Sequence, residues 1–268
     1  MQLRAPAKIN LSFRILSRRA DGFHEIETLM APISLHDVLT IEPNDSIEFT
    51  CNDPSLPTGD DNLVVKAARL FGRGARIHLE KRIPHGAGLG GGSSDAASVL
   101  LGLNAIYKTN FPREALAEIA EQIGSDVPFF IFESAARCGG RGELVVPTRL
   151  TNPIRFLLLK PAFGVPTPWA YSRWSDSGEL SGINYAPQEF AGVEFVNDLE
   201  RPVFEKHVIL AQAKIWLLAQ PEVGVALMSG SGSTVLAALR DGADADSLAA
   251  RAKTELDQEL WTCACETV

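Results

Sequence analysis

The stretch "PHGAGLGGGSSDAAS" at residues 84–98 places five glycines, Gly86, Gly88, Gly90, Gly91 and Gly92, directly before a segment with helical character. Glycine lets the backbone approach another group closely, and the free amides at a helix N-terminus attract anions. Three polar residues follow the glycines and are expected as cap and first-turn residues of the helix, namely Ser93, Ser94 and Asp95. The stretch predicts an anion cradle, and the alternative is a tightly packed glycine turn capped by serine.

The spacing of these glycines can be compared with three known phosphate-binding patterns. Gly86, Gly88 and Gly91 fit Gly-x-Gly-x-x-Gly, but that pattern also needs a tight strand-to-helix turn and a later acidic residue at a strand end. A P-loop requires a lysine after its second glycine, and this lysine is missing. A protein-kinase glycine loop continues into a strand, whereas "SSDAAS" follows here. Since an exposed helix dipole contributes only about 0.3–1 kcal/mol, other positive charges must help to hold a polyphosphate.

Composition narrows the classes of partner. The chain has 268 residues, 46% of them hydrophobic and 22% charged, with a formal net charge of -8. This length suits two domains, and the negative charge argues against nucleic acid or a membrane surface as partner. The four cysteines show no metal-site spacing, no signal peptide is evident, and the apolar run "VPFFIF" at 127–132 is only strand-sized. We expect a reduced, cytoplasmic protein with a small-molecule ligand.

Strand-like and helix-like segments alternate along the chain and predict an α+β fold with domains at 1–150 and 151–268. In the first strand, Lys8, Asn10 and Ser12 share one face. The other expected strands lie at 20–30, 36–43, 46–51, 75–83, 154–160, 224–230 and 233–240, the helices at 60–72, 94–107, 112–124, 200–220 and 244–257, and a proline-rich loop at 161–171.

Three of these stretches together resemble the motifs of the GHMP kinases. They are "PAKINL" at 6–11, the glycine stretch at 84–97 and "LMSGSGSTV" at 227–235, in the family's order. The resemblance implies an N-terminal domain like the second domain of ribosomal protein S5 and a ferredoxin-like C-terminal domain, with the active site between them. It also implies phosphorylation of a small-molecule hydroxyl by ATP with Mg²⁺, whose ligands the sequence does not identify.

Further stretches resemble one branch of that family, whose substrate is an alcohol carrying cytidine diphosphate. These are 19–30, 60–70, 124–130, "GVPTPWAY" at 164–171 and "VNDLE" at 196–200. We expect a monomer or weak homodimer. The resemblance implies Lys8 and Asp126 as catalytic residues, Asn10, Phe23, His24, Thr167 and Tyr171 as substrate-binding residues, and Asn62, Lys81, Gly86, Gly88, Leu89, Gly90, Gly91, Gly92, Ser93, Ser94 and Asp95 as ATP-binding residues.

Each of these residues also has an ordinary explanation. Lys8 is equally compatible with a solvated strand edge, Asp126 with a turn and "SGSG" at 229–232 with a hairpin. At the level of function, the alternatives are a non-catalytic nucleotide-binding protein with the same fold, and a kinase for mevalonate, homoserine or a sugar. The presence of both Lys8 and Asp126 favours an enzyme over a binding protein.

Overall fold

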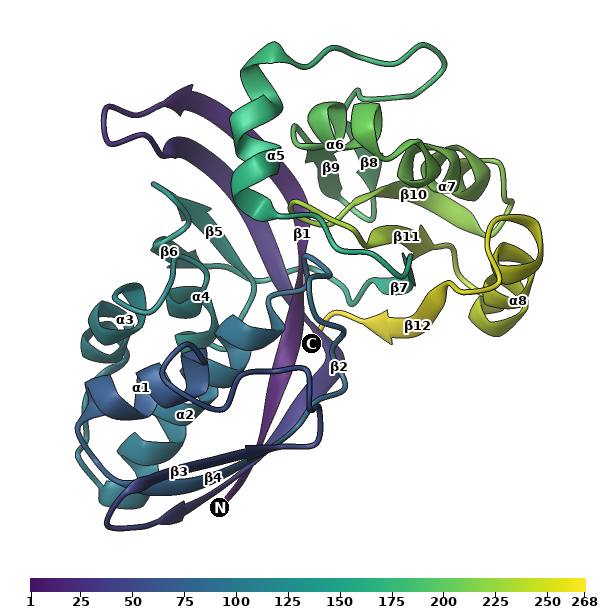
Figure 1. The fold of residues 1–268 in the computed structure, drawn as a ribbon. Coiled ribbons are helices and arrows are strands. Elements are labelled where there is room, and N and C mark those ends of the chain that lie inside the picture. The colour runs from purple at the N-terminus through teal and green to yellow at the C-terminus, as the bar shows by residue number, and fades with distance from the viewer.

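The computed structural model describes residues 1–268, and it contains two β-sheets with helices packed against both (Figure 1). The α+β class is confirmed. The first sheet has eight strands in the order β3-β4-β2-β1-β9-β8, with β5 and β6 attached to β2. Its strands are β1 (Gln2–Arg18), β2 (His24–Pro43), β3 (Ile47–Cys51), β4 (Ala75–Glu80), β5 (Ala136–Gly139), β6 (Leu144–Pro147), β8 (Gln188–Phe190) and β9 (Val193–Asn197).

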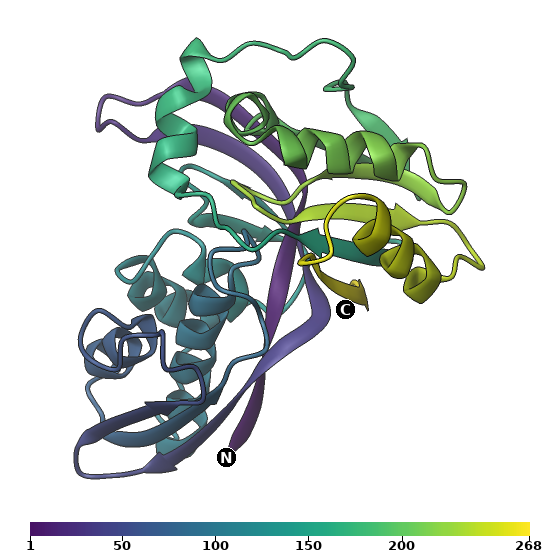
Figure 2. The ribbon, with the colours of Figure 1, turned by 45° about the vertical axis from the view of Figure 1, so that its right-hand side comes forward.

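The long hairpin of β1 and β2 runs through both halves of the molecule (Figures 1 and 2). Its antiparallel register shifts between Pro6 and Lys8 and again between Asn10 and Ser12. Such bulges bend a strand and redirect its side chains, so strict alternation does not describe this segment. Lys8 and Asn10 are both buried, and the hypothesis of a solvated strand edge at Lys8 is therefore wrong.

Four helices cover the first sheet: α1 (Leu63–Phe71), α2 (Gly91–Tyr107), α3 (Arg113–Glu121) and α4 (Val127–Ile131). The first three confirm the predicted helices. The apolar face of α2 packs into the core with Val99, Leu100 and Leu103, all fully buried. The apolar run "VPFFIF" at 127–132 lies mostly in the short helix α4, where Pro128 stands in the first turn and its missing amide costs the helix nothing.

The second sheet has the order β10-β11-β7-β12, formed by β7 (Arg155–Lys160), β10 (Val223–Met228), β11 (Val235–Leu239) and β12 (Trp261–Glu266). Side chains of β7 are buried on both faces. Leu157 and Leu159 pack with the helices α7 (Val208–Leu218) and α8 (Ala245–Glu255), whereas Phe156 and Leu158 pack with residues of β1. The second sheet is therefore a layer between its own helices and the first sheet, which explains the unbroken apolar run in β7.

Three expectations for the second half need correction. The helix predicted at 200–220 is divided at His207, whose φ of -118° and ψ of 69° separate α6 (Glu200–Lys206) from α7. The loop at 161–171 passes into α5 (Thr167–Arg173) and a short 3-10 helix, η1 (Trp174–Asp176), because prolines suit a first helical turn. Strand β12 was not foreseen, since the polar and small residues of "WTCACE" lack a strand signal.

The two halves of the chain both contribute strands to the first sheet. Strand β9, from the second half, pairs in parallel with β1 through Ser12–Val196 and Phe13–Asn197. The division at residue 150 stays a prediction. No helix of the structure has both the length and the apolar character required to cross a membrane.

The buried face of α2 generates a prediction about stability. Leu103→Ala removes a side chain that is 0% exposed, and we expect the free energy of unfolding to fall by about 2–5 kcal/mol because a cavity remains. The control Leu70→Ala, at a helix position 39% exposed, is expected to change it by about 0.5 kcal/mol or less. Urea unfolding of both variants measures the difference, and equal losses would contradict the assigned core.

Candidate active site

Two connected cavities lie between the two halves of the molecule. The outer cavity has a volume of about 430 Å³ and the inner one about 240 Å³. Both are lined by Asp126 at the start of α4, Arg141 in the loop between β5 and β6, and Thr167 and Tyr171 of α5, and these residues mark where the cavities meet. Residues more than 100 positions apart in the sequence therefore form one concave site.

The glycine stretch lines the inner cavity and leads into α2. Gly90, at φ 69°, occupies the N-cap position, and no side chain caps the helix, so the expectation of a serine cap is wrong. The helix begins at Gly91, and its first amides have no partner within the helix. Gly88 packs against the "SGSG" loop, since a Cβ on Gly88 would lie 2.4 Å from the Ser229 carbonyl oxygen. The stretch combines both expected features: a closely packed turn and a helix N-terminus with free amides.

Lys8 lies at the centre of a buried polar group. Its Nζ donates to Asn10 Oδ1 at 2.6 Å and lies 3.5 Å from Asp126 Oδ2. The side-chain amide of Asn10 in turn donates to Thr28 Oγ1 at 2.8 Å. The Asp126 side chain is 40% exposed and borders both cavities, whereas that of Lys8 is 6% exposed. Lys8 is thus fixed in the wall, and the carboxylate of Asp126 is accessible.

A second ionic group lies behind the start of α2. Lys81 Nζ contacts Asp37 Oδ2 at 2.5 Å and Asp95 Oδ2 at 3.0 Å. Burial, opposed by Lys81, raises the pKa of the Asp95 carboxyl, and its Oδ1 has no partner. Asp95 is therefore easier to protonate than an ordinary aspartate, which reduces the repulsion that a carboxylate at this helix terminus exerts on an anion.

Asp37 holds the backbone that leads into the glycine stretch. Its Oδ1 accepts the amides of Arg82 at 2.5 Å and Ile83 at 2.8 Å, and the residue is 0% exposed. Asp37 was missed in the sequence because a lone aspartate inside a strand carries no periodic or motif signal. The hydrogen bonds of Asp37 join residues that are 44 or more positions apart in the chain, so no local pattern reveals them.

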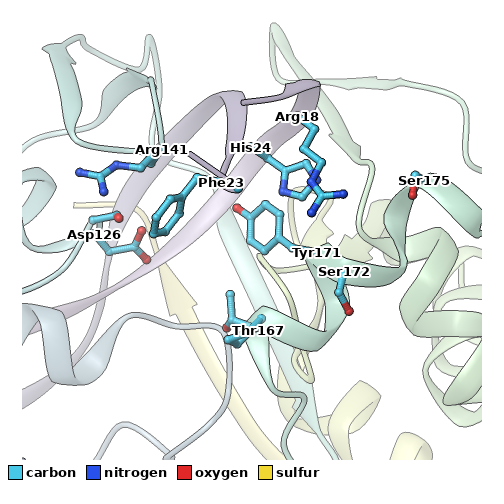
Figure 3. A pocket seen from close by; sticks show the side chains of 12 residues that line it. Arg18, Phe23, His24, Asp126, Arg141, Thr167, Tyr171, Ser172 and Ser175 are labelled. Carbon is cyan, nitrogen blue, oxygen red and sulfur yellow. The ribbon is translucent and has the colours of Figure 1, made fainter. Parts of the chain in front are cut away.

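The outer cavity is lined by aromatic side chains from both halves of the molecule. The rings of Phe23 and Tyr171 and the imidazole of His24 project into it, with Arg141 beside Phe23 (Figure 3). His24 stacks on Tyr171 with centroids 5.2 Å apart, and the Arg141 guanidinium lies 5.0 Å from the Phe23 centroid. Burial, with a smaller effect of Asp126, raises the pKa of Tyr171, and burial lowers that of His24. Both rings are therefore neutral near pH 7.

The structure brings most of the predicted site residues to these cavities. The predicted residues that line one or both are Lys8, Asn10, Phe23, His24, Gly86, Gly88, Leu89, Gly90, Asp126, Thr167 and Tyr171. Those outside both are Asn62, Lys81, Gly91, Gly92, Ser93, Ser94 and Asp95. Asn62 caps α1 by accepting the Val64 amide at 2.9 Å. Its role toward a nucleotide, like every residue role above, stays a prediction.

Arg141 was also missed, although it lines both cavities. Its flanking glycines in "GGRGE" were the available signal, since a charged residue between glycines often belongs to a loop that carries function. Its guanidinium also contacts Glu121 at 3.1 Å. Thr167 Oγ1 bonds Ser231 Oγ at 2.8 Å, which links α5 to the "SGSG" loop.

Comparison with known proteins agrees with this arrangement. Residues 62–134 match the family model "GHMP kinases N terminal domain". The 4-diphosphocytidyl-2-C-methyl-D-erythritol kinase of Methylacidiphilum infernorum is 46% identical over 87% of this chain and 84% of its own. That of Pelobacter propionicus is 37% identical over 100% and 99%. A crystal structure of 4-(cytidine 5'-diphospho)-2C-methyl-D-erythritol kinase superposes with a TM-score of 0.80 at 36% identity over both whole chains.

The fold and the paired glycine loops define a small-molecule kinase of the GHMP type, which confirms the expected architecture. Within that class, the sequence identity to these relatives over most of the chain assigns the particular family. The chain belongs to the 4-diphosphocytidyl-2-C-methyl-D-erythritol kinase family.

The contact between the glycine loops generates a second prediction. In Gly88→Ala the new Cβ would lie 2.4 Å from a backbone oxygen, so one loop must move. Overpacking of this kind costs about 1–3 kcal/mol, and we expect the KM for the nucleotide to rise by about 5- to 150-fold.

The matched control is Gly182→Ala, where φ is also positive (83°) but a Cβ meets nothing within 4 Å. It introduces the same kind of backbone strain without the clash, and kinase activity is expected to stay unchanged. Steady-state kinetics at varied nucleotide concentration measures both variants. A normal KM for the nucleotide in Gly88→Ala would show that this loop contact does not contribute to nucleotide binding.

Proposed function

We propose that the protein transfers the γ-phosphoryl group of ATP to the 2-hydroxyl of 4-diphosphocytidyl-2-C-methyl-D-erythritol, in the non-mevalonate pathway to isoprenoid precursors. The observation that carries this proposal is the Lys8–Asp126 pair, 3.5 Å apart, at the junction of the two cavities. An acceptor in the outer cavity and a phosphate donor at the glycine stretch would both reach Asp126. The names of the relatives support the choice of substrate.

The residues around the glycine stretch fit the phosphates of ATP. The unpartnered first amides of α2 provide hydrogen-bond donors for an anion, and the glycines of this stretch, Gly86, Gly88, Gly90, Gly91 and Gly92, allow its backbone to approach the anion closely. Two residues are candidates to hold Mg²⁺ directly or through water: Asp126, which lines both cavities, and Ser94, whose buried Oγ has no hydrogen-bond partner. The ion would be held mainly by the phosphates of ATP, and the chemistry it would supply is neutralisation of their negative charge.

Lys8 and Asp126 have complementary parts in the proposed reaction. A carboxylate, with an ordinary pKa of about 3.9, is too weak a base to deprotonate an alcohol before bond formation. Proton transfer to Asp126 Oδ therefore occurs late, as the attacking oxygen loses electron density to phosphorus. The ammonium of Lys8, oriented by Asn10, stabilises negative charge at that oxygen. Since phosphoryl transfer depends mainly on positioning and charge, this pair meets its principal demands.

Recognition of cytosine is assigned to the aromatic group of the outer cavity. Phe23 and Tyr171 offer ring faces for stacking, and His24 offers ring nitrogens for the polar edge of the base. His24 packs on the Tyr171 ring, with 5.2 Å between the ring centroids, so the imidazole belongs to the same aromatic group.

The alternative acceptors mevalonate, homoserine and sugars lack a base. The test is a panel of these alcohols, free methylerythritol and its cytidine diphosphate derivative, each with ATP and Mg²⁺. Phosphorylation of the cytidine derivative alone is expected. Equal turnover of free methylerythritol would contradict the assigned outer cavity. The expected cytoplasmic location and monomeric or weakly dimeric state remain predictions.

Asp126→Asn tests the proton acceptor. The amide cannot accept the hydroxyl proton, and we expect kcat to fall by about 10²-fold or more with nearly unchanged nucleotide binding. The control Asp241→Asn replaces an exposed aspartate that lines neither cavity and is expected to retain full activity. Stopped assays for kcat and calorimetric titration with ATP measure the two effects. A kcat within twofold of the parent value would remove Asp126 from the chemistry.

Tyr171→Ala tests the stacking. Loss of one stacked ring is expected to raise KM for the cytidine substrate by about 10- to 150-fold, with a smaller change for ATP. Tyr171→Phe keeps the ring and is expected to keep KM, because the hydroxyl has no assigned contact with the base. Initial-rate measurements with each substrate varied in turn decide the point. A parallel rise of both KM values in Tyr171→Ala would show a general distortion of the site instead.

A further inference from the structure

The "SGSG" loop at 229–232 contacts the site through its backbone. A Cβ on Gly230 would lie 3.2 Å from Asn10 Oδ1 and 3.5 Å from Lys8 Nζ, and Ser229 Oγ donates to the Gly88 carbonyl at 3.3 Å. Small movements of this loop therefore alter both the glycine stretch and the environment of Lys8. Its position must be fixed by groups outside the cavities.

Asn197, at the end of β9, forms hydrogen bonds with the loop and with the residue before it. Its Nδ2 donates to the carbonyls of Met228 at 2.6 Å and Gly230 at 2.8 Å, while its Oδ1 accepts the Leu199 amide at 2.9 Å. The residue is 4% exposed. Because β9 pairs with β1 at Phe13–Asn197, this side chain ties the loop to the strand that carries Lys8.

Glu200 forms a further hydrogen bond with the same segment, at Met228. Its Oε1 accepts the Met228 amide at 2.8 Å, and its Oε2 accepts from Lys214 Nζ at 2.6 Å. Glu200 and Lys214 are each 2% exposed in their side chains. Both backbone groups of Met228 are thus bound by side chains of the segment 197–200, just before the loop begins.

We propose that Asn197 and Glu200 are positioning residues that set the 229–232 loop against the glycine stretch, with Lys214 neutralising the buried Glu200. This inference rests on the proposed function for its kinetic consequence but not for its structural one. Neither residue touches the cavities described above, so their effect on catalysis passes through the loop. A buried carboxylate suits this task because it binds an amide more strongly than a neutral acceptor does.

The experiment compares two charge-balanced double variants. In Glu200→Gln/Lys214→Met the charges are gone but a side-chain oxygen still accepts the Met228 amide. In Glu200→Leu/Lys214→Met the charges are replaced by apolar groups of similar volume, a change that buried ion pairs often tolerate, and the acceptor is lost. The difference between the two variants isolates the hydrogen bond to the loop.

Hydrogen exchange of residues 229–233, measured by mass spectrometry without nucleotide, is the first readout. We expect about tenfold or faster exchange in the leucine variant and near-parent exchange in the glutamine variant, as loss of one hydrogen bond to a charged acceptor predicts. The second readout is KM for ATP, expected to rise about tenfold or more only in the leucine variant. Unchanged exchange in the leucine variant, or equal changes in both variants, would overturn the proposal.

Asn197→Asp provides an independent test with a matched control. It places a carboxylate oxygen against two carbonyls, and we expect faster exchange of the loop and a higher KM for ATP. Asn152→Asp makes the same substitution at an exposed position outside this network and is expected to change neither. A lower melting temperature without any change in loop exchange would assign Asn197 a purely structural role and overturn the proposal. If no variant or parent phosphorylates the cytidine substrate, the proposed function fails while the exchange data still decide the loop anchor.

Discussion

The site depends on backbone contact between two glycine loops that are about 140 residues apart in the chain. Gly88 faces the Ser229 carbonyl so closely that no side chain fits between them, and the Thr234 amide donates to the Ala87 carbonyl at 3.3 Å. Contact of this kind requires glycine, because a Cβ on Gly88 would lie 2.4 Å from the Ser229 carbonyl oxygen and would force the two backbones apart. It closes one side of the inner cavity and brings Lys8, from a third segment, between the loops.

Buried ion pairs support both loops in similar ways. Asp37, paired with Lys81, accepts the amides of Arg82 and Ile83 before the first loop. Glu200, paired with Lys214, accepts the Met228 amide before the second. A buried charge is costly unless it is paired and hydrogen-bonded, and each carboxylate meets both conditions. Each oriented carboxylate binds backbone amides and thereby fixes the segment that leads into the loop.

Lys8 differs from those lysines in the freedom of its partner. Asp126 remains 40% exposed at the cavity junction, and the distance of 3.5 Å to Lys8 is longer than in the two supporting pairs. An accessible carboxylate next to a buried ammonium suits a group that must exchange a proton with a ligand. The difference in exposure thus distinguishes the pair that we propose for catalysis from the supporting pairs, although all three combine lysine with an acid.

The sequence by itself determined the α+β class, most helices and the location of both glycine loops, because glycine runs, helix periodicity and cap residues are local signals. It also contained the family motifs from which Lys8, Asp126 and the aromatic residues were predicted. Only the tertiary structure decided that Asp37, Asn197 and Glu200 hold the approaches to the loops, that Arg141 lies between the cavities and that His24 stacks on Tyr171. These facts arise from contacts between distant segments. No periodicity along one segment encodes such contacts, because their geometry follows from how the sheets and the β1–β2 hairpin pack together.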